Sequence, residues 1–375
     1  FLGAGKAKEA NKAATQGLFL NVIHGILLTI VGLMIMPSFL AMFTNDQTVI
    51  GMGLQYSTII LMFSTIIMAS ISFEKIFQAV GNMVITMIAL MTGCIVNIVL
   101  DPLLIFGIGF FPKLGIQGAA LATGIGQSST LILYLIAYVL RPIHVKIRKD
   151  YLKLEAVCVK RLYAIGIPAT LNMALPSFLV SALNAILASF SQTYVVVLGV
   201  YYKLQTFLYL TANGMIQGMR PIMSYNYGAK NTERVKGTFL LLLKASLTYS
   251  IILWGLVMLF PQVFAGIFTS NPALVIFTKK ALRVYMAVMF MFGIQISCQM
   301  AFNSLGKAIS SIVVAVMRKF VLLIPLIYIM PHIFTTDQTM AVYMAEPVAD
   351  FIAVTFTAIL FSVQFKKALA AIRLN

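Results

Sequence analysis

Acidic residues are scarce in this chain of 375 residues, which has 10 Asp and Glu against 27 Lys and Arg. The few acids are scattered, so no group of neighbouring carboxylates indicates an enzyme active site or a metal centre. Three cysteines and three histidines are present, and their spacing matches neither a zinc site nor a disulfide framework. No phosphate-binding glycine loop, nucleophile elbow or HExxH motif occurs. These absences argue against an enzyme and against a bound organic cofactor.

Long polar stretches are also missing, because 61% of the residues are hydrophobic, 10% are charged, and the mean hydropathy is +0.97. A soluble domain of this composition would expose a very large apolar surface. Apolar runs of about 20 residues are long enough to cross a bilayer as helices. The sequence predicts an all-α, multi-pass membrane protein with ten transmembrane helices at about residues 17–43, 50–77, 83–109, 118–140, 162–189, 193–219, 237–263, 276–301, 308–331 and 340–364.

The basic residues, which give a formal net charge of +17, follow the loops between the predicted helices. One set of alternate loops, with the C-terminal tail, contains nineteen Lys and Arg, and the opposite set contains four. Because cytoplasmic loops are enriched in Lys and Arg, the first set is predicted to face the cytoplasm. The charge thus reflects topology and anionic lipid headgroups, and no nucleic-acid partner is expected. Four basic residues fall inside predicted helices: Lys203, Lys244, Arg318 and Lys319.

The chain contains an internal repeat, because several matches share one offset of 225 residues. The matched positions are Gly3-Ala4 with Gly228-Ala229, Phe43-Thr44 with Phe268-Thr269, Phe77 with Phe302, and Gly81 with Gly306. Two apolar segments precede Gly228 in the second copy, so their equivalents, about seventy residues, are expected before residue 1. We predict a first lobe of four helices at 1–140, without its first two helices, a cytoplasmic linker at 141–160, and a six-helix lobe at 161–375.

The most informative polar residues inside a predicted span are Asn97 and Asp101, which lie one helical turn apart. A carboxylate in the middle of a membrane costs about 2.5 to 3.5 kcal/mol, so it needs a function or a partner. Pro102 cannot donate the hydrogen bond that the carbonyl of Ile98 would accept. Together these oxygens predict a site for a proton or for Na⁺, held by Asp101 and Asn97, at an interrupted helix. In the alternative interpretation, Asp101 ends its helix near the membrane surface and Pro102 only adds a kink.

Further polar pairs occur at matching positions of the two copies. Thr123 and Gln127 on one helix correspond to Glu346 and Asp350, with an offset of 223 residues that Pro102 and Pro325 share. Glu346 and Asp350 could bind a cation or a cationic substrate, or they could pair with Arg318 or Lys319 on the preceding helix. Other candidates for a substrate cleft are Glu74, Gln78, Gln299, Tyr202 and Gln205. For Glu74, an interfacial ion pair with Lys75 is the alternative interpretation.

Three segments, FEKIFQAVGN (73–82), NIVLDPLLIFG (97–107) and LGIQGAALAT (114–123), resemble the multidrug and toxic compound extrusion (MATE) transporters, especially their MepA-like branch. Residues 217–231 and 318–325 are also similar to that family. The resemblance implies a fold of twelve helices in two pseudo-symmetric six-helix lobes, arranged as an inverted V around a central cleft. It further implies export of cationic amphipathic compounds by Na⁺ or H⁺ antiport, with Asn97, Asp101 and Thr123 lining the ion site of the first lobe.

This chain departs from the family pattern at two positions. The family's acidic ligand on the first helix falls in the part that is predicted to be missing. The Glu that some relatives carry on the seventh helix has no counterpart within residues 167–176. These departures put a second-lobe ion site in doubt and leave Glu346 and Asp350 as the local acids.

The sequence thus predicts a monomeric exporter of small lipophilic cations that works by alternating access in the cell membrane. The nearest rival is a flippase for lipid-linked oligosaccharides of the same superfold, which would need a more cationic cleft. A membrane-embedded enzyme is the rival from another class, and the scattered acids argue against it.

Overall fold

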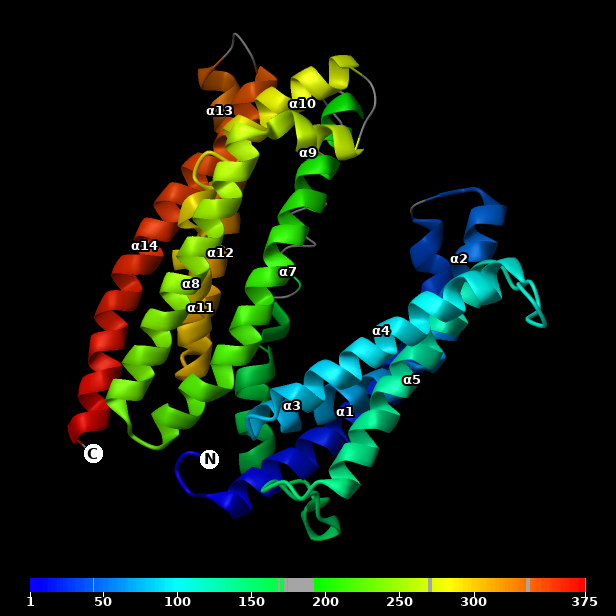
Figure 1. The fold of residues 1–375 in the computed structure, drawn as a ribbon, viewed down its shortest axis with the longest axis vertical. Coiled ribbons are helices and arrows are strands. Elements are labelled where there is room, and N and C mark those ends of the chain that lie inside the picture. The colour runs from blue at the N-terminus through cyan, green and yellow to red at the C-terminus, as the bar shows by residue number, and fades with distance from the viewer. Residues whose placement is uncertain are drawn as a thin grey trace. The chain divides into compact units, whose positions relative to one another are not determined.

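Long helices make up most of the computed structural model, which describes residues 1–42, 44–167, 169–171, 174, 192–268, 272–334 and 338–374. No strand occurs in these ranges. The chain divides into two units, Phe1–Leu162 and Tyr163–Asn375 (Figure 1). Residues 141–160, predicted as a linker, belong to the first of these units.

The described residues of the first unit include five long helices and a short 3₁₀ turn, and a further helix that begins at Ala156 continues into the second unit. The five helices and the turn are α1 (Ala7–Ala41), α2 (Gln47–Met62), α3 (Ser64–Ala79), α4 (Met83–Phe106), α5 (Ile116–Leu140) and η1 (Lys149–Tyr151). Local sequence sets several of the boundaries. The carboxylate of Asp46 accepts a hydrogen bond from the backbone nitrogen of Thr48 (2.8 Å) and so caps α2. Gly107, with φ of 72°, adopts the left-handed conformation that ends α4.

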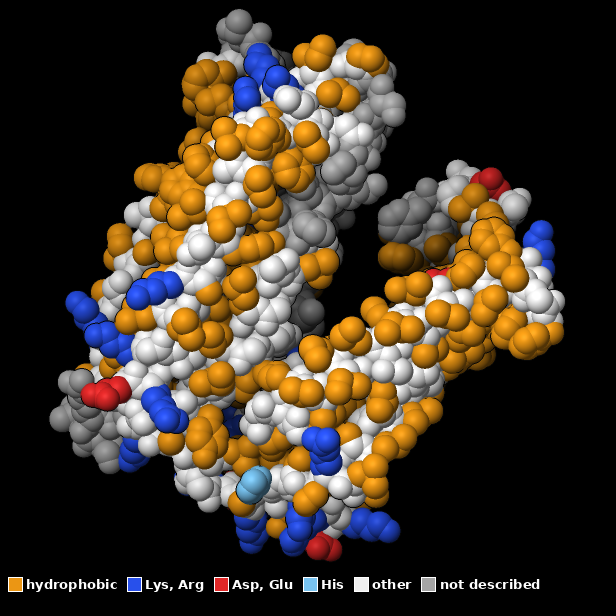
Figure 2. All heavy atoms as spheres, viewed as in Figure 1, with side chains coloured by type: hydrophobic (Ala, Val, Ile, Leu, Met, Phe, Trp, Pro, Cys, Tyr) orange, Lys and Arg blue, Asp and Glu red, His pale blue; other side chains and the backbone are white. Residues whose placement is uncertain are grey.

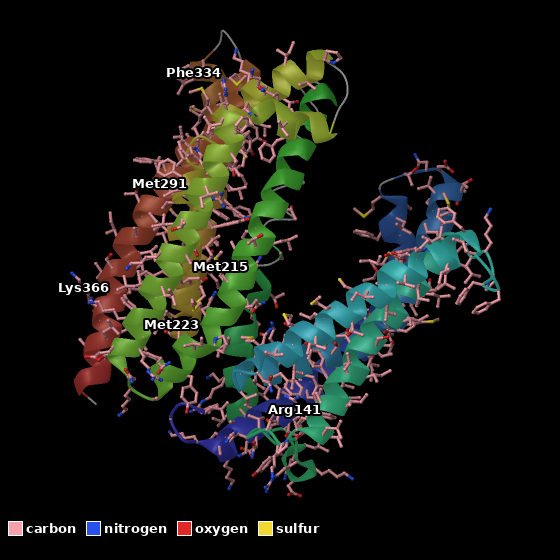
Figure 3. The ribbon with its side chains drawn as sticks, in the orientation of Figure 1. Arg141, Met215, Met223, Met291, Phe334 and Lys366 are labelled. Carbon is pink, nitrogen blue, oxygen red and sulfur yellow. The ribbon has the colours of Figure 1, made fainter. Side chains whose placement is uncertain are left out.

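The second unit contains more and shorter elements. They are α7 (Gln192–Gly228), α8 (Thr232–Leu259), α9 (Pro261–Phe268), α10 (Pro272–Tyr285), η2 (Met289–Met291), α11 (Phe292–Ser304), α12 (Ala308–Val316), the π-helical turn η3 (Met317–Leu323), α13 (Ile324–Ile333) and α14 (Gln338–Leu374). Met215 and Met223 of α7 (Figure 3) contribute to a core cluster that includes the buried rings of Phe302 and Phe361. Flexible thioethers suit such irregular contacts between helices.

The described residues contain six helices that are long and apolar enough to cross a membrane, or up to eight spans if two bent pairs count as one span each. These eight correspond to eight of the ten predicted helices. Most of the predicted helix at 162–189 lies outside the described residues, and α7, which covers 193–219, is not among the eight. The multi-pass all-α fold is therefore confirmed, whereas the count of ten is not.

The outer surfaces of both units are apolar (Figure 2). Large side chains such as Met34 (75% exposed) and Val139 (80% exposed) point away from the packed helices. In water these side chains would be costly, but acyl chains solvate them. The basic side chains gather at one end of the first unit in Figure 2, where Arg141 ends α5 (Figure 3). This distribution agrees with helices that cross a bilayer.

The internal repeat is visible in the backbone. Gly81 and Gly306 have φ of 78° and 73°, and each follows the end of a helix. In both copies a buried Phe accepts a hydrogen bond from the nitrogen five residues later, Phe77 from Asn82 (2.9 Å) and Phe302 from Lys307 (2.8 Å). Only glycine adopts this turn without strain. The α2–α3 pair and the pair formed by α10 and α11 are each bent by 48°. The two copies thus share local structure as well as sequence.

The segment after α5 is fixed to the beginning of α1 by polar side chains of α1. Gln16, which is fully buried, donates its Nε2 to the carbonyl of Lys153 (2.8 Å), and its Oε1 accepts a hydrogen bond from the nitrogen of Glu155 (3.4 Å). Asn11 accepts a hydrogen bond from the nitrogen of Lys146 (2.8 Å). These contacts explain why residues 141–160 cluster with the first unit.

We expect Gln16→Ala to lower the free energy of unfolding of the first unit by about 1 to 3 kcal/mol, because it leaves two backbone groups without partners. Thermal unfolding in detergent, monitored by tryptic cleavage between residues 141 and 161, measures the effect. Lys12→Ala is the control, since Lys12 makes only an ion pair with the exposed Glu155. Equal effects of the two substitutions would contradict the conclusion that Gln16 holds the segment after α5 in place.

Candidate functional site

The interface between α4 and α5 is closely packed because glycines line it. A Cβ atom on Gly93 would lie 2.0 Å from Oγ1 of Thr130, and one on Gly126 would lie 2.7 Å from the carbonyl oxygen of Gly93. Likewise, a Cβ atom on Gly118 would lie 2.5 Å from the carbonyl oxygen of Leu104. Small residues allow such close contact between membrane helices. The interface therefore brings polar side chains of the two helices within reach of each other.

Asn97 and Thr123 meet across this interface, as the family resemblance implies for residues that line one site. The Nδ2 of Asn97 donates to Oγ1 of Thr123 at 3.4 Å, and Thr123 donates to the carbonyl of Ala119 at 3.0 Å. Both side chains are half-buried. Gly126 positions Asn97, because a Cβ on Gly126 would lie 3.1 Å from the Cβ of Asn97.

Asp101 lies one turn after Asn97 on α4. Its Oδ1 is buried, and within the described residues no hydrogen-bond donor reaches this atom. A buried carboxylate oxygen without a donor is costly, so such an atom favours a bound proton or cation. The described residues contain no cluster of three or more His, Cys, Asp and Glu. The atoms that could bind an ion here are therefore the carboxylate, amide and hydroxyl oxygens of Asp101, Asn97 and Thr123. Oxygen atoms of these kinds suit a proton or a hard cation such as Na⁺.

Helix α4 passes through Pro102 and ends at Phe106, so the predicted interruption at Pro102 is wrong. The alternative in which Asp101 ends its helix is also wrong. A proline removes one backbone hydrogen bond, and the neighbouring turns of α4 keep the helix continuous. The break in the first unit occurs instead at Phe63, between α2 and α3. A Cβ on Gly124 of α5 would lie 2.4 Å from the ring of Phe63, so this ring fills the space that the glycine leaves.

Glu74 and Gln78 bond to each other and to a lysine. Oε1 of Glu74 accepts hydrogen bonds from Nε2 of Gln78 (2.8 Å) and from Nζ of Lys75 (2.9 Å). This is the ion pair that the sequence offers as the alternative to a cleft residue. Gln127 lies one turn after Thr123 on α5 and is half-buried, as is Gln299 on α11. The side chains of Tyr202 and Gln205 lie outside the described residues.

In the second unit, Arg318 of η3 joins the two acids of α14. Its Nη2 donates to Oδ2 of Asp350 (3.0 Å) and to Oε1 of Glu346 (3.2 Å), and its Nε donates to Oδ1 of Asp350. Tyr285 of α10 donates its hydroxyl to Oε2 of Glu346 (3.4 Å). The pairing with Arg318 matches the ion-pair interpretation of the sequence. No sequence pattern indicates Tyr285, because it lies 61 residues from Glu346.

We expect Gly126→Ala to destabilise the first unit by about 1 to 3 kcal/mol, because the new methyl group collides with the backbone of Gly93. The same collision pushes Asn97 away from Thr123, so it should also weaken the binding of any cation that these two side chains hold. Thermal unfolding in detergent measures the first effect, and titration with Na⁺ at several pH values measures the second. Gly17→Ala is the matched control, since a Cβ there has no atom within 4 Å. A melting temperature that is unchanged in Gly126→Ala would contradict the packing argument.

Two units of long apolar helices, with ionisable groups buried between the helices, are typical of a multi-pass membrane transporter. The MatE family model matches residues 1–103 and 168–329. The chain belongs to the MATE family of transporters. Relatives are named as multidrug export proteins and as an FAD transporter, and the chain is accordingly a small-molecule efflux transporter of the cell membrane rather than an enzyme.

Individual relatives agree with this assignment. The chain is 21% identical over 353 residues to the multidrug export protein MepA of Staphylococcus haemolyticus, covering 94% of this chain and 77% of that protein. It is 29% identical over 265 residues to an FAD transporter of Shewanella oneidensis, covering 69% of this chain and 56% of the relative. The structure of a MOP superfamily transporter from Pyrococcus furiosus superposes with a TM-score of 0.90 at 22% identity, covering 98% of this chain and 81% of that one.

Proposed function

We propose that the protein exports lipophilic cations in exchange for Na⁺ or H⁺. The observation that carries this proposal is the buried Oδ1 of Asp101, which has no donor among the described residues. A carboxylate in this position is stable with a proton or with a bound cation, and unstable with neither. Loading and release of the ion therefore change the energy of the α4–α5 interface in the first unit.

The two units act in this proposal as the two lobes of an alternating-access transporter. The cation binds beside Asp101, Asn97 and Thr123, and its binding favours the state of the transporter that releases substrate outside. Dissociation of the ion on the cytoplasmic side restores the state that accepts substrate. A ligand shifts such an equilibrium only by its difference in affinity for the two states. One carboxylate that requires a counter-cation supplies that difference. We propose that one chain carries out the cycle as a monomer.

The residues that contact the substrate are proposed from the sequence positions of polar side chains. Lipophilic cations are held in apolar surroundings by a few polar groups. We propose that the substrate is contacted in the first unit by Glu74, Gln78 and Gln127, and in the second unit by Tyr202, Gln205, Gln299, Glu346 and Asp350. Glu346 and Asp350 are engaged with Arg318 in this structure, so a cationic substrate would have to compete with the guanidinium.

Transport of ethidium into proteoliposomes tests the proposal, with Na⁺ and pH gradients imposed separately. We expect one of the two gradients to drive accumulation of the dye against its concentration gradient. Accumulation that follows neither gradient would contradict antiport. Transport of a radiolabelled lipid-linked oligosaccharide, which is anionic, in the same vesicles distinguishes the exporter from the rival flippase. Transport of a lipid-linked oligosaccharide without a gradient would instead support the flippase.

A second candidate substrate is a flavin dinucleotide, because the Shewanella oneidensis relative, an FAD transporter, is more similar in sequence than MepA over the aligned part. Such a substrate is anionic, and it would favour basic rather than acidic side chains at the cleft. The vesicle assay with FAD in place of ethidium decides between the two. We expect ethidium to be transported faster. Faster transport of FAD would reverse the assignment of substrate class.

A further inference from the structure

The repeat places different charges at corresponding positions of the two units. Thr123 and Gln127 of α5 correspond to Glu346 and Asp350 of α14, since both pairs share the offset of 223 residues. At its candidate ion site the first unit therefore has one acid, Asp101, beside the neutral side chains of Asn97 and Thr123. The second unit has two acids on the equivalent helix face. An acid pair one turn apart would need more positive charge than a single coupling ion provides.

The second unit supplies that positive charge from its own chain. Arg318 donates to both carboxylates, and the side chains of Arg318, Glu346 and Asp350 are 13%, 5% and 15% exposed. A guanidinium presents its donors in a fixed fork, which matches two oxygens of Asp350 at once. The π-helical turn at Met317–Leu323 carries this side chain at the packed face of α14. Such turns often occur at functional sites.

The charges of this cluster balance without any added ion. Glu346 and Asp350 carry two negative charges when ionised, and Arg318 carries one positive charge. Lys319, the next residue of η3, is half-buried and carries a second positive charge, which interacts favourably with both carboxylates through space. Tyr285 of α10 faces Glu346 as a neutral donor. The cluster thus differs from Asp101, for which the described residues provide neither a donor to Oδ1 nor an ion pair.

We propose that Arg318 is a tethered counter-cation that replaces the free ion in the second unit. The transporter then couples each cycle to one cation, bound at Asp101, and the second unit binds none. This inference rests on the proposed antiport, because it assigns the coupling ion to one of two related sites. It also explains how a buried pair of acids is tolerated when α14 contributes no basic residue near them.

The first part of the test counts cations that bind to the purified protein in detergent, with ²²Na⁺ and with proton uptake after a pH step. Wild type should bind one cation with an Asp101-dependent affinity. Arg318→Gln should bind one additional cation, because its two carboxylates have lost one built-in charge, and Arg318→Lys should return the count to the wild-type value. An unchanged count in Arg318→Gln would overturn the proposal.

The second part uses a variant in which the arginine and both acids are replaced by neutral residues, because Arg318→Gln alone could fail to fold. In Arg318→Met with Glu346→Gln and Asp350→Asn, we expect the same number of bound cations as in wild type, and the efflux that remains should still depend on the driving gradient. Loss of one bound cation, or loss of the response to the gradient, would show that the second unit binds a coupling ion. Failure of the antiport itself has a different signature. In that case wild-type efflux ignores both gradients while the cation counts of the Arg318 variants still differ.

Discussion

Asp101→Asn is expected to remove the dependence of efflux on the driving ion, while the protein still folds and still binds ethidium. The substitution replaces a carboxylate by an amide of the same shape, so it removes the charge that requires a counter-cation. The loss of one contact to a charged group is about 1.5 to 3 kcal/mol, which corresponds to a 10- to 100-fold weaker affinity for the ion. Dye accumulation in proteoliposomes under the gradient that drives the wild-type protein measures the effect.

Asp46→Asn is the matched control for this experiment. Asp46 belongs to the same unit, is exposed, and caps α2 by accepting a hydrogen bond from Thr48. Because asparagine caps helices as well as aspartate does, this control should keep wild-type transport and wild-type ion dependence. If Asp101→Asn behaved like Asp46→Asn, energy coupling would not take place at Asp101.

Arg318→Met is expected to cause the largest loss of stability in the second unit, about 3 to 5 kcal/mol, because it leaves two buried carboxylates without their guanidinium. Adding Glu346→Gln and Asp350→Asn should restore most of that loss, since amides do not need a counter-charge. Chemical or thermal unfolding in detergent measures both values. The sign of the second effect matters most, because restored stability shows that the loss in Arg318→Met comes from the two carboxylates left without a counter-charge.

Lys244→Met provides the control for this series. Lys244 lies on α8 of the same unit, it is exposed, and no described carboxylate forms an ion pair with it. Its replacement should change the unfolding free energy by less than about 0.5 kcal/mol. A large effect of Lys244→Met, or a small effect of Arg318→Met, would contradict the account of the buried cluster.

Much of the fold follows from local patterns in the sequence. Apolar runs predict the helices because the bilayer requires about 20 apolar residues per crossing. The repeat pairs Gly81 with Gly306, and in the structure both have a positive φ at the turn after a helix. The family resemblance, rather than spacing, implies that Asn97 and Thr123 belong to one site, and the structure places Nδ2 of Asn97 3.4 Å from Oγ1 of Thr123.

Contacts between distant helices could not be predicted in this way. The proline at Pro102 indicates a break, yet α4 is continuous, and the bend occurs at Phe63, where the sequence has neither Pro nor Gly. The ring of Phe63 lies against Gly124 of α5, and this long-range contact has no signature in the local sequence. For the same reason the sequence leaves the partner of Glu346 open, whereas packing of α10 and η3 against α14 brings Tyr285 and Arg318 to it.

The most direct measurement counts the cations that leave the purified protein when ethidium binds. The account predicts that saturating dye releases one H⁺ or one Na⁺ per wild-type chain, and that the Asp101→Asn variant binds the dye and releases none. Calorimetry in buffers of different ionisation enthalpy detects the protons, and ²²Na⁺ displacement detects the sodium. Dye binding without release of either cation in the wild-type protein, or undiminished release in Asp101→Asn, would contradict ion exchange at Asp101.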